Sequence, residues 1–137
     1  MTYRLSKFKE TDSGAFTATI MLDGKSVGSV ENSGRGGSNL YWFNTPADMW
    51  AYEIQATTLF PKEVSEVSDC FLNHLILLFE ANRIRGIVAV TSEYDFLETG
   101  RYLSFKTGTD ISALKTHLLQ TRGVPYLVWD KKSYSFA

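Results

Sequence analysis

Residues 15–32, AFTATIMLDGKSVGSVEN, decide the fold. Side chains alternate over residues 15–22, with Phe16, Ala18, Ile20 and Leu22 on one side, as in a strand with one buried face. Asp23-Gly24 then supplies the positive φ angles of a tight hairpin turn. In the return strand, Val27 and Val30 are three residues apart and would face opposite sides of a regular strand. A bulge at Gly28 would restore one apolar face. The stretch therefore predicts an antiparallel hairpin.

Further elements are expected on both sides of this hairpin. Tyr3, Leu5 and Phe8 indicate an earlier strand, and residues 40–43 a later one. Short strands are also expected at residues 87–90, 101–106 and 124–129. Helices are expected from Thr45-Pro46, from about Glu63 to Arg85, and from Asp110 to Gly123. The sequence thus predicts an α+β fold, with about three helices packed on a mostly antiparallel sheet, and a single domain over residues 1–137.

Composition limits the classes of function. The 137 residues are 44% apolar and 21% charged, which is close to the average of globular proteins. A net charge of −1 gives no broad basic surface for nucleic acid. Cys70 is the only cysteine, and no signal peptide or apolar run long enough for a bilayer is present. We therefore expect a cytoplasmic protein without a membrane partner.

Residues 32–39, NSGRGGSN, form a glycine-rich loop after the hairpin. Three interpretations remain open for it: a β–β connection that needs positive φ, a contact loop for a partner, or a backbone nest for a phosphate beside Arg35. It is no P-loop, because no Gly-Lys-Ser/Thr ending and no helix follow. We expect Gly34, Gly36 and Gly37 to shape the loop.

An aromatic triplet, Tyr41-Trp42-Phe43, follows the loop. Because strand side chains alternate, one ring must face opposite to the other two. Two rings are expected in the core, and the exposed one would be a binding anchor. The predicted binding residues are Arg35, Asn39, Tyr41 and Trp42.

Other reactive residues predict no catalytic or metal site. Cys70 and His74 share a helical face, but no second Cys or His cluster completes a metal site. Glu93 and Asp95 are interpreted as part of a solvated hairpin that turns at Thr99-Gly100. A basic cluster of Arg83, Arg85, Arg101 and Lys106 fits either solvated element ends or a phosphate contact. No cofactor and no metal are expected.

The hairpin and loop resemble a group of small uncharacterised proteins of bacteria and their phages. The shared pattern is Asp-Gly-Lys-x-Val-Gly-x-Val followed by Asn-x-Gly-x-Gly-Gly, which here spans residues 23–30 and 32–37. The resemblance implies a mobile-element context and supplies no catalytic residue.

These observations favour a non-enzymatic binding protein, a phage or mobile-element accessory factor that contacts and modulates a host protein. One alternative is a nucleic-acid or nucleotide-binding module in which Arg35 holds phosphate and Tyr41 or Trp42 stacks a base. Another is a small enzyme whose cleft is built from residues far apart in sequence.

Overall fold

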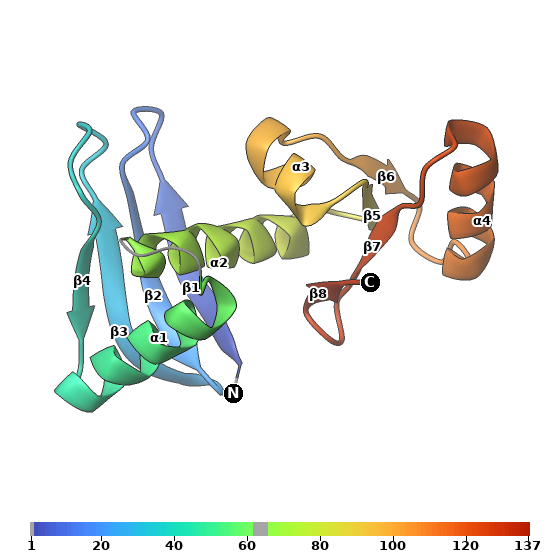
Figure 1. The fold of residues 1–137 in the computed structure, drawn as a ribbon. Helices are drawn as coiled ribbons and strands as arrows, with labels where there is room; N and C mark the ends of the chain where they lie inside the picture. Colours follow the sequence, from blue (N-terminus) through green and yellow to red (C-terminus); the bar gives the residue numbers. More distant parts are fainter. Residues whose placement is uncertain (1, 62–65) are drawn as a thin grey trace. The chain divides into compact units, whose positions relative to one another are not determined.

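The computed structural model describes residues 2–61 and 66–137 and has the predicted α+β class. The described residues form four helices and two four-stranded antiparallel sheets (Figure 1). The chain divides into two compact units, Met1–Phe79 and Glu80–Ala137. The single domain over residues 1–137 stays a prediction.

The first unit contains the predicted hairpin in the middle of its sheet. The strand order is β1 (Tyr3–Glu10), β2 (Phe16–Leu22), β3 (Lys25–Asn32) and β4 (Leu40–Phe43). Asp23 and Gly24 join β2 to β3 with φ angles of 50° and 84°, so the predicted hairpin turn is confirmed.

Two bulges, one on each side of β2, keep the hydrophobic side chains on one face. In β1 the register shifts beside Lys7, whose φ is 52°, and Phe8 therefore joins Tyr3 and Leu5 in the core. In β3 the register skips Val27, so that Val27 is buried along with Val30. The predicted bulge is thus present, although the extra residue is Val27 and not the glycine that follows it.

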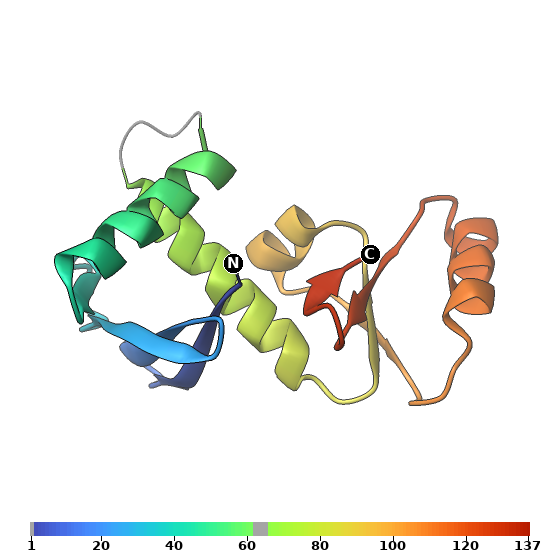
Figure 2. The same cartoon turned by 90° about the horizontal axis from the view of Figure 1, so that it is seen from below.

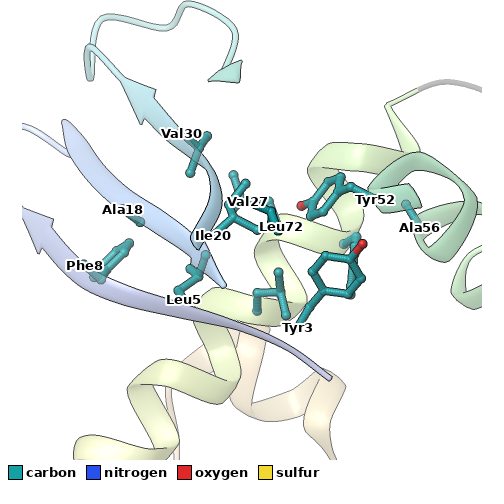
Figure 3. Close-up of a cluster of buried hydrophobic side chains, with 12 residues drawn as sticks. Tyr3, Leu5, Phe8, Ala18, Ile20, Val27, Val30, Tyr52, Ala56 and Leu72 are labelled. Atoms are coloured by element: carbon teal, nitrogen blue, oxygen red, sulfur yellow. The ribbon is translucent and has the colours of Figure 1, made fainter. Parts of the chain in front are cut away.

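Helices α1 (Pro46–Leu59) and α2 (Val67–Arg83) cover one face of this sheet (Figures 1 and 2). The Thr45 hydroxyl caps α1 by accepting from the Asp48 amide at 3.1 Å, as predicted. Between sheet and helices lies the core in Figure 3. At its centre the Tyr52 ring packs with the rings of Tyr3, Tyr41, Phe43 and Phe71. The predicted start of the second helix near Glu63 lies outside the described residues.

The second unit has a separate sheet in the order β6-β5-β7-β8. Its core contains Ala89, Leu114, Leu118 and Val128. The described elements are β5 (Ile87–Val90), α3 (Glu93–Thr99), β6 (Leu103–Phe105), α4 (Ile111–Arg122), β7 (Leu127–Asp130) and β8 (Ser135–Phe136).

Helix α3 corrects the prediction of about three helices, because it replaces the expected solvated hairpin. The Ser92 hydroxyl accepts from the Asp95 amide at 2.9 Å and caps the first turn. Gly100, with φ of 68°, closes the last turn. Turn residues at both ends therefore terminate a short helix, and its Phe96 is buried.

Candidate functional site

The exposed hydrophobic side chains of the first unit gather on two consecutive elements. Within its described residues, every large exposed hydrophobic side chain belongs to β4 or α1. We call these residues the β4–α1 surface: Leu40, Trp42, Met49, Trp50, Ile54 and Leu59. Strands β1, β2 and β3 contribute none, so the distribution is concentrated and not scattered.

The three aromatic rings of β4 alternate between the two faces of the sheet, as predicted. Tyr41 and Phe43 are half-buried and pack against the core. Trp42 points the other way and is 52% exposed, so the prediction of two core rings and one exposed ring is confirmed. Trp42 lines a shallow hollow of about 360 Å³ on the open sheet face, beside Lys7 and Lys9.

A groove of about 460 Å³ runs along the other side of β4, toward α1. Leu40 and Met49 contribute apolar side chains to it, and Glu53 contributes a carboxylate. Because β4 is the edge strand of its sheet, this groove lies along a strand that has only one neighbour.

Helix α1 presents an apolar side outward. The sequence places Trp50 and Ile54 on one side of the helix, and they are 60% and 67% exposed. The core instead takes Tyr52, because that ring fits among four other aromatic rings and its hydroxyl donates to the Ser68 carbonyl at 3.3 Å. Two exposed tryptophans, Trp42 and Trp50, thus belong to elements adjacent in the chain.

The glycine-rich loop is held by one asparagine. The Asn32 side chain accepts from the Gly34 amide at 2.8 Å and donates to the Gly37 carbonyl and to Asn39 Oδ1. Gly34 and Gly36 have φ angles of 73° and 79°, as expected for loop-shaping residues. Gly37 lacks a positive φ, and a Cβ there would lie an ordinary 3.9 Å from Ser33.

Asp69, in the first turn of α2, binds two of the predicted contact residues. Its Oδ1 accepts from Asn39 Nδ2 at 2.9 Å and from the Tyr41 hydroxyl at 2.5 Å. Burial, followed by the hydrogen bond to Asp69, raises the pKa of Tyr41, so this phenol keeps its proton and donates. Asn39 and Tyr41 therefore position β4 against α2. Nothing in the local sequence around Asp69 indicated this role, since its partners lie about thirty residues earlier.

Arg35 and Trp42 are the predicted binding residues whose side chains face solvent. Arg35 is exposed and has no ion-pair or hydrogen-bond partner for its guanidinium within residues 2–61 and 66–137. It is therefore available to a partner, unlike Asn39 and Tyr41.

The one cysteine and one of the two histidines lie on the same helix. Cys70 and His74 are half-buried on α2, and the His74 ring lies 6.3 Å from that of Phe60. In the part of the chain that the structure describes, no three His, Cys, Asp or Glu side chains are grouped to hold a metal. Nor does any described helix have the length and apolarity needed to cross a membrane.

Comparisons with protein-family models, with curated proteins and with solved structures find no match to this chain.

Proposed function

We propose that this chain is a non-enzymatic binding protein that contacts and modulates a partner protein through the β4–α1 surface. The observation that carries the proposal is the concentration of exposed hydrophobic side chains on these two elements. Exposed hydrophobic side chains gathered on two adjacent elements favour a protein contact, and tryptophan is enriched among residues that dominate binding energy. Trp42 and Trp50 are the expected anchors.

The charges on the β4–α1 surface favour a protein partner over a nucleic-acid partner. Neither β4 nor α1 contains a lysine or arginine, whereas α1 carries Asp48 and Glu53. A phosphate backbone would be repelled by these carboxylates. The Gly34 amide, one donor of the suggested phosphate nest, already has Asn32 as its acceptor. A partner with apolar side chains fits the surface best, with basic groups facing Asp48 and Glu53 on α1 and acidic groups facing Lys7 and Lys9 beside Trp42.

The resemblance of the hairpin and loop to small phage and bacterial proteins supports a setting for this contact. In the proposal the chain acts in the cytoplasm as a phage or mobile-element accessory factor, and the partner is a host protein. Arg35, exposed and without a partner among the described residues, adds a polar contact beside the surface.

The test is capture from a bacterial lysate by the tagged full chain, followed by mass spectrometry and titration of the captured protein against purified variants. Trp42→Ala and Trp50→Ala should each weaken binding at least about tenfold, as expected when an anchor residue is truncated. Arg35→Ala should weaken binding while changing stability by less than about 0.5 kcal/mol.

Tyr94→Ala is the matched control, because Tyr94 is a 73% exposed aromatic residue in the second unit. It should bind like the unaltered chain. The proposal is wrong if the tryptophan variants bind as the unaltered chain does, or if Tyr94→Ala loses as much affinity as they do.

A further inference from the structure

The second unit has a pocket of about 250 Å³ where three strand ends meet. Because β6 and β7 both run antiparallel to β5, the end of β5 lies beside their beginnings. Ala89 pairs with Leu103, and Val90 pairs with Leu127. The buried Ala89 and Val90 line the pocket, so its apolar floor belongs to the sheet itself.

Two arginines from distant parts of the sequence line this pocket. Arg101 precedes β6, and Arg122 is the last residue of α4. Neither guanidinium has an ion-pair or hydrogen-bond partner among the residues that the structure describes. Like charges repel, so a fold that brings two unpaired guanidinium groups to the lining of one pocket favours an anion bound in that pocket. A guanidinium binds phosphate through two parallel N–H donors.

The other polar side chains of the pocket indicate which kind of anion it would bind. Tyr102 and Tyr126 add phenol groups, and the Tyr102 ring packs edge-on against Phe96 at 6.0 Å. Asp95 also lines the pocket, and its Oδ2 accepts from the Thr91 hydroxyl at 3.1 Å. An ionised carboxylate accepts hydrogen bonds and repels a bare anion. The pocket therefore matches a ligand that carries both a phosphate and hydroxyl donors.

We propose that this pocket binds a phosphorylated sugar, with Arg101 and Arg122 on the phosphate and Asp95 accepting from a sugar hydroxyl. The site is independent of the β4–α1 surface and adds a small-molecule ligand to the proposed protein partner.

The test is titration of the isotope-labelled full chain with ribose 5-phosphate, followed by amide chemical shifts. The sugar phosphate should shift the amides of Arg101, Tyr102 and Arg122 saturably. Arg101→Gln and Arg122→Gln should each weaken binding at least about tenfold, since each removes a charge-assisted contact. Lys131→Gln removes the same charge from an exposed position outside the pocket and should stay within about twofold of the unaltered chain.

Ribose and inorganic phosphate are the matched probes. Each should bind at least about fivefold more weakly than ribose 5-phosphate, because ribose lacks the phosphate group and inorganic phosphate lacks the sugar hydroxyls. Asp95→Asn should remove the preference for the ester over phosphate. The proposal is overturned if ribose 5-phosphate produces no saturable shifts at the pocket, or if Lys131→Gln weakens it as much as the arginine variants. It is also overturned if a single-stranded oligonucleotide binds the pocket more tightly than the sugar phosphate.

Discussion

Replacing Gly34 by alanine tests whether the glycine-rich loop is a built part of the first unit. Gly34 has a φ of 73°, and an added Cβ would lie 2.5 Å from the Ala15 amide nitrogen and 2.9 Å from the Ser13 carbonyl oxygen. Both neighbours are backbone atoms of the turn between β1 and β2, so neither can rotate away as a side chain would. The turn must move, or the loop must change its conformation.

The expected loss of stability in Gly34→Ala has two causes, the positive φ and the close contacts of the added Cβ. A left-handed backbone costs a residue with a Cβ about 1–2 kcal/mol. Overpacking against fixed neighbours adds about 1–3 kcal/mol, giving a loss of about 2–5 kcal/mol in the free energy of unfolding. For a chain of this length, about 3–4 °C of melting temperature corresponds to each kcal/mol, so Gly34→Ala should melt at least about 6 °C lower.

Gly37→Ala is the control within the same loop. Its backbone has no positive φ, and a Cβ would meet only Ser33 Oγ at 3.9 Å. It should therefore change the free energy of unfolding by less than about 0.5 kcal/mol. Thermal and urea unfolding of both variants give the comparison. Equal melting temperatures for the two variants would refute the reasoning, because the loop would then tolerate a side chain at either glycine.

Three further substitutions test the core and its polar contacts. Asp69→Ala removes the acceptor of Asn39 and Tyr41 and should lower the free energy of unfolding by about 2 kcal/mol in urea titrations; a loss below about 0.5 kcal/mol would contradict that role. Tyr3→Phe deletes a buried hydroxyl that has no hydrogen-bond partner among the described residues, so stability should hold or rise by up to about 1 kcal/mol, and a clear loss would point to a partner. Burial raises the pKa of Tyr52 above its ordinary 10.0. As the pH rises past 10, Tyr52 therefore loses its proton more readily in the unfolded chain than in the folded one, and the free energy of unfolding, which is fully present below pH 10, falls. Tyr52→Phe should reduce this alkaline loss by about 1 kcal/mol per pH unit, and an unchanged slope would exclude Tyr52 as its source.

Local patterns predicted the first sheet because its strands follow one another in the chain. The Asp23-Gly24 turn sets the hairpin, and alternation sets which side of each strand is buried. The short helix α3 was missed because Ser92 and Gly100 serve equally well in a turn and at helix ends, and seven residues carry little periodicity. The strand predicted at residues 124–129 is present as Leu127–Asp130, whereas the strand at Ser135–Phe136 is too short to be separated from a turn by sequence alone.

The contacts that define the candidate sites depend on tertiary structure. Which side of α1 is buried was decided by the fit of Tyr52 among rings from three other elements, and this leaves Trp50 outside. Asp69 binds residues about thirty positions earlier, and Arg101 reaches the same pocket as Arg122 only because antiparallel strands bring their ends together. No local sequence pattern predicts contacts between residues so far apart in the chain.

The two bulges beside β2 are the positions at which the first sheet can lose a residue without turning core side chains toward solvent. Each bulge sets which face the neighbouring strand residues occupy, since a shift by one residue reverses inside and outside. Each bulge holds one residue more than the strand it pairs with. Deleting Lys7 would therefore leave Tyr3, Leu5 and Phe8 in regular alternation, and deleting Val27 would keep Gly28 and Val30 on their present face while removing the buried Val27 side chain. Deleting a paired residue such as Thr19 of β2 would instead reverse the side chains on one side of the deletion, so it should be tolerated far less well than deletion of Lys7.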